Sequence, residues 1–556
     1  MIEALTVYTA RRIHTMDAGR PLATAIAVAG ERIVSVGSLQ TLAPWLERIP
    51  HRIDRRFEND ILMPGFIDPH THLRMSGVFQ CLHYVGPIES HGPTGPQPPC
   101  ASRDQVLARI RALVGALDDP SEPVICWGFD PGMQGGHLDR DMLDAISTVT
   151  PIWVSCYAPH IVYTNTPMIA LTDVTEDSHD HGIGRFADGR LNGWFVETEA
   201  YARAMRPLVR RIYQPGFGER ALRVHAASTV RAGITCVADM GWGLTRFEDE
   251  WRDHAALAAD TSFPLRMVLV PFEPALRRRY GADRFDFLDE YRARSSTRLS
   301  THGVKWINDG SYPAMTLQLN FPGYLDRDDG RTGEVPWQEM LEVMAPYWER
   351  GDQIHSHANG DATVDMTLDT LAALQLRKPR FDHRFTIEHY CISTPAQARR
   401  LAALGGAASV NPYFVNLRAQ IHADMGFGPD RAEATARLGS LARAGAAFCL
   451  HSDYNLVVAP MAPLTAAWNA VNRLAADGHT VVAPGERISV DRALRAITID
   501  AAFVLRRDHE LGSLEAGKLA DFAVLAQDPF EVDPTELKDI AVRGVVTGGV
   551  VHMADG

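Results

Sequence analysis

Two histidines separated by one residue, His70 and His72, are the part of this chain best suited to chemistry. They close the segment PGFIDPHTH, residues 64–72, which begins as a short apolar run. Because side chains alternate along a strand, both imidazoles would project to the same side. Two imidazoles at this spacing can hold one metal ion. An isolated His-x-His pair also arises by chance, so its meaning depends on partners elsewhere in the chain.

Four more polar residues lie at the ends of later apolar runs: Lys305, His357, His389 and Asp453. Imidazoles and a carboxylate suit zinc first, with manganese, iron or nickel as alternatives. The set could hold one or two divalent ions. The ammonium of Lys305 can contribute only if it is deprotonated, or carboxylated by CO2 into a bridging group. The alternative is a lysine that pairs with an acid or contacts the substrate.

Short apolar runs alternate with amphipathic segments through the middle of the chain, which is typical of parallel βα units. Eight runs favour an α/β fold, a closed (β/α)8 TIM barrel in which the carboxyl ends of the strands form the active site. A doubly wound open sheet is the alternative, but no GxGxxG turn follows the first strand. The runs are residues 61–68, 234–241, 265–272, 303–309, 353–357, 385–390, 407–412 and 446–453.

Both ends of the chain are rich in β-branched runs broken by glycine, and neither carries enough strands for a core of its own. We therefore expect residues 1–61 and 505–556 to form one composite β-sandwich, with the barrel over 62–504. About residues 73–220 are too long for a βα connection and predict an insertion after barrel strand 1. Such an insertion would cover the catalytic face as a lid or substrate-specificity module.

The composition excludes several classes of protein. A formal net charge of −13 argues against binding to nucleic acid or to anionic membranes. The seven cysteines show no CxxC spacing, which is typical of a reduced protein. There is no signal-like N-terminus and no apolar run long enough to span a bilayer. We expect a cytoplasmic enzyme with a small-molecule substrate, and the sequence leaves open whether it is a homodimer.

The motifs PGFIDPHTHL, VKWINDGS, HSHANGD, TIEHY and HSDY, followed by LGSLEAGKLADFAVL at residues 511–525, resemble the amidohydrolase superfamily. The similarity is greatest to the YtcJ-type, or amidohydrolase-3, branch, which includes N-substituted formamide deformylases. It covers nearly the whole chain in the right order. It implies a barrel joined to a β-sandwich, in agreement with the pattern of strands.

The resemblance also assigns roles. His70 and His72 match the first metal pair, His357 and His389 match the ligands after strands five and six, and Asp453 matches the aspartate after strand eight. Lys305 matches a strand-four lysine that resembles the carboxylated bridging lysine of binuclear relatives. Weaker matches suggest substrate contacts for His160, in YAPHIVYTN, and for Glu197, in GWFVE. The alternative for His160 is a packed or surface histidine. Aromatic residues, Trp306 among them, suggest a hydrophobic or aromatic substrate, although most would serve simply as core.

The chemistry implied is hydrolysis of a C–N bond in an amide, formamide, carbamate or lactam, the class EC 3.5. A metal would activate water, and Asp453 would accept its proton and return it to the leaving amine. His389 or His160 would stabilise the oxyanion. A deaminase or an esterase on the same barrel is the alternative, disfavoured because HANGD stands where deaminases carry HxxE. A non-catalytic scaffold is a third possibility, disfavoured because the ligand set is complete.

Overall fold

All eight apolar runs form strands in the computed structural model, which describes residues 4–158, 161–212, 217–325 and 337–554. The chain divides into two compact units. The first comprises Met1–Thr71, Ala226–Ser452 and Met461–Gly556, and the second comprises His72–His225 and Asp453–Pro460. Each unit is described separately below.

The strands that correspond to the eight runs, together with the short strand β16, lie in two parallel arcs within the first unit. One arc has the order β16-β15-β14-β5 and the other β17-β18-β19-β20-β21. A parallel bridge between Phe272 and Lys305 joins the end of β15 to β17. The strands are β5 (Phe66–Thr71), β14 (Ile234–Trp242), β15 (Arg266–Pro271), β16 (Leu299–Thr301), β17 (Val304–Ile307), β18 (Ile354–Ala358), β19 (Thr386–His389), β20 (Ala407–Val410) and β21 (Ala447–Leu450).

The predicted closure of the barrel is the point at which the structure differs. Over the residues described, no ladder pairs β21 with β5. Instead the backbone N–H of Ile67 donates to Ile497 O, and the side chain of Asp68 accepts hydrogen bonds from Ser452, which follows β21. One backbone hydrogen bond to Ile497 and the side-chain bonds of Asp68 therefore take the place of a strand ladder at this seam.

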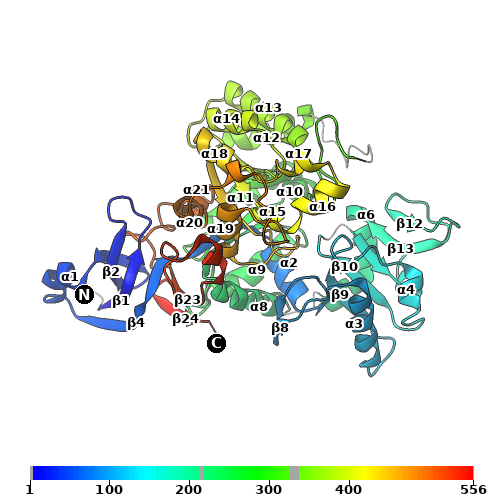
Figure 1. Cartoon of the computed structure of the whole chain (residues 1–556), viewed down its shortest axis with the longest axis horizontal. Coiled ribbons are helices and arrows are strands. Elements are labelled where there is room, and N and C mark those ends of the chain that lie inside the picture. Colours follow the sequence, from blue (N-terminus) through cyan, green and yellow to red (C-terminus); the bar gives the residue numbers. More distant parts are fainter. Residues whose placement is uncertain (1–3, 159–160, 213–216, 326–336, 555–556) are drawn as a thin grey trace. The chain divides into compact units, whose positions relative to one another are not determined.

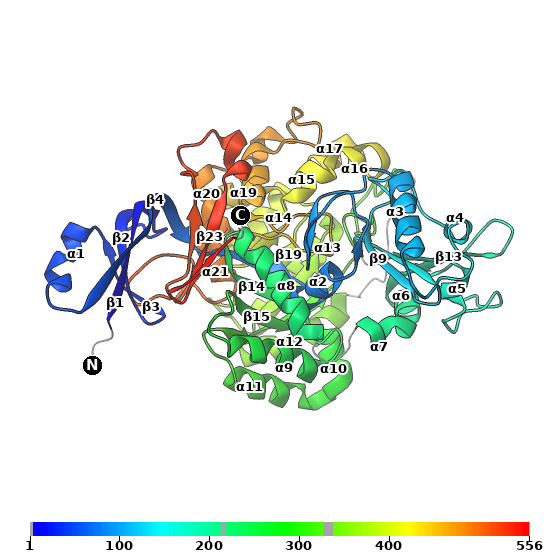
Figure 2. The ribbon, with the colours of Figure 1, turned by 90° about the horizontal axis from the view of Figure 1, so that it is seen from below.

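Helices cover the outer side of the arcs: α9 contacts β15 and β16, α10 contacts β17, and α12 and α13 contact β18 (Figure 2). The strands are buried on both faces, as expected when helices cover a parallel sheet. The helices of this unit are α1 (Leu39–Leu46), α9 (Phe247–Ala258), α10 (Glu273–Tyr280), α11 (Arg284–Ala293), α12 (Trp337–Arg350), α13 (Asp361–Arg377), α14 (Pro395–Ala403), α15 (Tyr413–Leu417), α16 (Ala419–Met425), α17 (Pro429–Ala432), α18 (Leu438–Ala444), α19 (Pro463–Asn472), α20 (Val490–Ala496) and α21 (Ile499–Val504).

Both ends of the chain meet in one seven-stranded sheet of order β24-β23-β22-β4-β1-β2-β3, whose blue and red strands are visible in Figure 1. Apolar side chains from both ends, including Ile13, Leu62 and Val524, share one core. A two-layered sandwich stays a prediction, because the strands of both ends belong to this single sheet. They are β1 (Leu5–His14), β2 (Leu22–Ala29), β3 (Arg32–Gly37), β4 (His51–Pro64), β22 (Phe522–Leu525), β23 (Val542–Thr547) and β24 (Val550–Met553).

The second unit contains its own six-stranded sheet, of order β12-β13-β11-β10-β9-β6, and its own apolar core. It occupies the part of the chain in which the insertion was expected. Its elements are α2 (Leu73–Gln80), β6 (His83–Tyr84), β7 (Ser90–Gly92), β8 (Gly95–Gln97), α3 (Arg103–Gly115), β9 (Val124–Phe129), α4 (Arg140–Asp144), β10 (Ile152–Cys156), β11 (Ile161–Thr164), α5 (Thr166–Ile169), β12 (Ile183–Arg185), β13 (Leu191–Val196), α6 (Glu197–Met205) and α7 (Val209–Ile212), and α8 (Phe217–Arg231) crosses into the first unit.

None of the helices in the described ranges is long and apolar enough to cross a membrane.

Candidate metal centre

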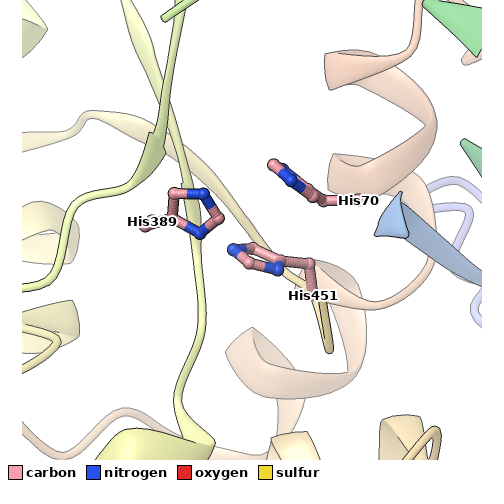
Figure 3. Close-up of side chains that lie close together, drawn as sticks. All are labelled: His70, His389 and His451. Carbon is pink, nitrogen blue, oxygen red and sulfur yellow. The ribbon is translucent and has the colours of Figure 1, made fainter. Parts of the chain in front are cut away.

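Three buried histidines meet at the carboxyl ends of three strands in the first unit (Figure 3). His70 lies near the end of β5, His389 ends β19, and His451 directly follows β21. Their ring centroids are separated by 4.6 Å for His70–His389, 4.7 Å for His70–His451 and 5.1 Å for His389–His451. One nitrogen from each ring lies within 4.8 Å of the others. We call these three residues the imidazole cluster.

Lys305 adjoins the imidazole cluster from β17. Its Nζ lies 3.4 Å from Nε2 of His70, and the residue is only 2% exposed. Burial, together with the neighbouring His357, His70 and Lys305, lowers the pKa of His389 well below its ordinary value. A neutral imidazole has a lone pair to offer, so this environment favours the form that binds metal.

Glu388 lies behind the cluster and contacts two histidines at once. Its Oε2 accepts a hydrogen bond from Nδ1 of His70 at 2.5 Å, and its Oε1 accepts one from Nδ1 of His355 at 2.7 Å. Burial alone would raise the pKa of Glu388, but the His355 hydrogen bond and the charge of Lys305 lower it to about 2. The carboxylate therefore stays ionised. His355, two residues before His357 on β18, is a buried residue that is hydrogen-bonded to it.

His357 lies beside the cluster, with its ring centroid 4.4 Å from that of His389. Its Nε2 lies 3.1 Å from Gly310 O, 2.9 Å from Nδ2 of Asn359 and 3.4 Å from Oδ1 of Asp309. Burial raises the pKa of Asp309 to about 6, although hydrogen bonds from the backbone of Asn359 and Gly360 oppose the shift. The structure therefore places His357 next to the cluster, with this nitrogen engaged by its own loop.

His72 and Asp453 form a pair within the second unit. Nε2 of His72 lies 3.4 Å from Oδ1 of Asp453. The backbone N–H of His72 donates to Tyr454 O at 3.3 Å, which joins the two segments that carry the pair. Asp453 has a left-handed backbone, with φ of 54°, a conformation that non-glycine residues adopt mainly where the surroundings enforce it.

The sequence as a whole matches a known family. The model described as the amidohydrolase family matches residues 58–552. The chain belongs to the amidohydrolase family. This confirms the resemblance that the motifs indicate.

Two curated relatives and one solved structure illustrate the similarity of this amidohydrolase to known proteins. Protein LONG AFTER FAR-RED 3 of Arabidopsis thaliana is 29% identical over 529 residues, covering 93% of this chain and 86% of the plant protein. N-substituted formamide deformylase of Arthrobacter pascens is 24% identical, covering 97% of this chain and 96% of the enzyme. An uncharacterized metal-dependent hydrolase from Pyrococcus horikoshii OT3 shares the fold, with a TM-score of 0.72, 18% identity, and coverage of 96% of this chain and 99% of that one.

Of the three residues predicted to contact substrate in this amidohydrolase, the structure describes the side chain of Trp306 alone. His160 lies outside the described residues, and of Glu197 only the backbone, at the start of α6, is described. Trp306 is buried, with the guanidinium of Arg277 5.7 Å from the centre of its ring. Because neighbours on a strand face opposite sides, Trp306 points away from the side of β17 that carries Lys305. Its position therefore gives no support to the predicted substrate contact.

Two residues of the centre escaped the sequence-based predictions. His451 lies in the motif HSDY, two residues before Asp453, to which the resemblance assigns the ligand of that segment. Glu388 lies in the motif TIEHY, directly before His389. The sequence does contain an indication of both residues. Each is polar and lies at the end of an apolar run, within two residues of a residue that was predicted as a ligand.

The residues of the imidazole cluster fit the divalent cation on which members of this fold family depend. Three imidazoles with donor atoms in mutual reach are, in their neutral form, a suitable ligand set for a borderline metal such as zinc. The hydrogen bond from His70 to a buried carboxylate is the kind of support that ligating histidines ordinarily have.

Proposed function

We propose that this amidohydrolase is a divalent-cation-dependent hydrolase that cleaves a C–N bond in a small amide, formamide, carbamate or lactam. The observation that carries the proposal is the convergence of His70, His389 and His451 beside Lys305 at the carboxyl ends of parallel strands. Active sites of barrel enzymes occupy this end of the strands. The similarity to an enzyme named N-substituted formamide deformylase supports the choice of bond.

The cation, with zinc as the first candidate, would be held by the imidazole cluster, and His72, His357 and Asp453 are the further ligands that the family motifs indicate. When bound, it would supply a Lewis acid that lowers the pKa of water and polarises a carbonyl oxygen. We assign His389 to cation binding rather than to the reacting carbonyl, because its nitrogen lies within reach of those of His70 and His451.

Asp453 is our candidate for moving the proton. It follows His451 by two residues, and His72, its neighbour at 3.4 Å, follows His70 by two residues. A carboxylate at this place in the sequence can accept a proton from the attacking water and return it to the leaving amine.

Lys305 is our candidate for the residue that would allow a second cation to bind. A protonated ammonium 3.4 Å from Nε2 of His70 would oppose a nearby cation, whereas the N-carboxylated side chain would attract one. If Lys305 is carboxylated, bicarbonate should raise cation stoichiometry in the wild type, and Lys305→Ala should hold fewer ions and ignore bicarbonate. Unchanged stoichiometry in Lys305→Ala would contradict the bridging role.

An apolar substituent on the substrate is favoured by Ile307, the last residue of β17. By strand alternation Ile307 faces the same side as Lys305. It keeps 43% of its surface exposed although the rest of the strand is buried, so it offers an apolar surface to a substituent of the substrate.

The experiment that tests the proposal combines metal analysis with a substrate panel. The purified protein is stripped with chelator, reloaded separately with Zn²⁺, Co²⁺ or Mn²⁺, and assayed on N-benzyl and N-alkyl formamides, acetamides, carbamates and lactams. We expect amine release that requires the cation. Ammonia released from amino-substituted heterocycles would instead identify a deaminase, and release of alcohol from esters alone would identify an esterase. Failure to retain any cation would contradict the proposal.

A further inference from the structure

Glu388 and its neighbour His389 both face His70, although they are consecutive residues of β19. Consecutive residues of a strand normally face opposite sides, yet Glu388 bonds His70 while the ring of His389 packs 4.6 Å from that of His70. The backbone of His389 is left-handed, with φ of 73°, and the next residue, Tyr390, is left-handed as well. This break in the alternation at the end of β19 lets two consecutive side chains address the same imidazole from two directions.

The hydrogen bonds of Glu388 fix which nitrogen of His70 faces the cluster. The two oxygens of Glu388 lie 2.5 Å from Nδ1 of His70 and 2.7 Å from Nδ1 of His355, so the carboxylate serves as the acceptor for both rings and each Nδ1 carries the hydrogen. A neutral imidazole carries one ring proton, so Nε2 of His70 is left with a lone pair. Nε2 is also the atom 3.4 Å from Nζ of Lys305, on the side of the ring away from Glu388.

We propose that Glu388 is a positioning residue of the metal centre: its carboxylate holds the His70 ring by Nδ1, so that Nε2 is presented to the cation as a lone-pair donor. This inference rests on the proposed function, since it requires a cation at the imidazole cluster. Glu388 and His70 are almost fully buried, so bulk solvent does not compete for their hydrogen bond. Partners of this kind typically change cation affinity by about 10-fold to 100-fold when removed.

The substitution Glu388→Gln tests the proposal with little change in volume. The amide offers one acceptor and one NH2 donor, so it cannot accept from both rings. One imidazole must then move its proton to Nε2 or turn away. We expect Co²⁺ affinity, measured by titration of the chelator-treated protein and followed by its visible absorption bands, to fall about 10-fold to 100-fold. Glu388→Asp keeps the accepting carboxylate and should bind Co²⁺ more tightly than Glu388→Gln.

Two matched variants separate positioning from a general loss of structure. His355→Gln disturbs the other half of the same carboxylate but leaves the bond to His70, so Co²⁺ affinity should stay within about 3-fold of the wild type. Glu250→Gln changes a buried glutamate that bonds the backbone of Gly243 and Thr245, and should leave the absorption bands unchanged. The thermal melting of each metal-free variant reports on folding.

The outcomes distinguish this inference from the function on which it rests. Wild-type protein that takes up no Co²⁺ would overturn both. Wild-type uptake with equal affinity in Glu388→Gln, or equal losses in His355→Gln and Glu388→Gln, would overturn only the role of Glu388. If Glu388→Gln fails to fold, Glu388→Asp is compared with His355→Gln instead. The proposal then requires altered Co²⁺ absorption bands in Glu388→Asp and unaltered bands in His355→Gln.

Discussion

His451 and Asp453 are two residues apart in the chain, yet the structure gives them different surroundings. His451 belongs to the imidazole cluster of the first unit, and Asp453 pairs with His72 in the second. The nitrogens of His451, His70 and His389 come from the ends of three different strands. The two residues should therefore respond differently to substitution.

His451→Ala should remove a cation ligand and little else. We expect cation affinity to fall by at least about 10-fold, measured as bound zinc per chain after dialysis, with activity falling in parallel. His383→Ala is the matched control, because His383 is equally buried but bonds the carbonyl of Leu404. Full zinc occupancy in His451→Ala would show that the cation lies elsewhere.

Asp453→Asn should separate chemistry from cation binding. Removing a proton-transfer group costs about 10²-fold to 10⁴-fold in kcat, while zinc content should fall less than in His451→Ala because the imidazole cluster keeps its three nitrogens. Steady-state kinetics and metal analysis on the same preparation check this. A variant that retains both zinc and full activity would exclude Asp453 as the proton carrier.

At this scale, spacing and residue type were enough to select His70, Lys305 and His389, which the structure brings together. Sequence could not rank His451 against Asp453, because both follow the same strand and only the fold decides which side chain meets the other rings. Trp306 illustrates a different limit. Its aromatic character suggested a binding role, whereas its place next to Lys305 on a strand puts it on the opposite face.

At the scale of elements, the eight apolar runs predicted the parallel strands because buried strands covered by helices are continuously apolar. The seam between β5 and β21 could not be predicted in the same way. There the connection is made by Asp68, whose carboxylate accepts hydrogen bonds from the backbone and hydroxyl of Ser452 at 3.2 and 2.5 Å. Such side-chain bonds have no periodicity that a sequence would reveal.

Asp68→Asn should weaken this seam. The amide places a donor against the N–H or hydroxyl of Ser452, and an unsatisfied buried polar group costs about 1–3 kcal/mol. Urea unfolding measures the loss in free energy of unfolding, and zinc content should fall with it because Asp68 lies two residues before His70. Ser452→Ala removes one bond and should cost less. If the two substitutions are additive in the double variant, Asp68 and Ser452 are not coupled.

At the scale of the whole first unit, one buried ion pair joins the parallel strands to the sheet made by the chain ends. Arg266 of β15 bonds both oxygens of Asp521, which directly precedes β22, at 2.7 and 2.9 Å. The backbone N–H of Gly548, between β23 and β24, donates to the same carboxylate. The sequence predicted that both ends would pair, but a lone arginine in a strand gave no indication of this link.

Breaking this ion pair should lower the free energy of unfolding, because it leaves the buried charge of Arg266 without the carboxylate of Asp521. Asp521→Asn should reduce the free energy of unfolding by about 3–5 kcal/mol, since Arg266 is fully buried. The double variant Arg266→Met/Asp521→Asn should recover part of the loss, because no unpaired charge remains. Denaturant unfolding followed by tryptophan fluorescence compares the three proteins. A double variant no more stable than Asp521→Asn would contradict this account.

The seven-stranded sheet also has a consequence for synthesis on the ribosome. Leu62 of β4 pairs with Ile13 on one side and with Val524 on the other, nearly the whole length of the chain later. While the nascent chain grows, one edge of β4 has no strand to pair with. Apolar residues such as Ile61 and Met63, which are buried in the folded protein, then remain exposed to solvent. Strand β22 therefore completes a sheet whose first strands are synthesised much earlier. Until β22 is made, the exposed edge of β4 needs protection from aggregation.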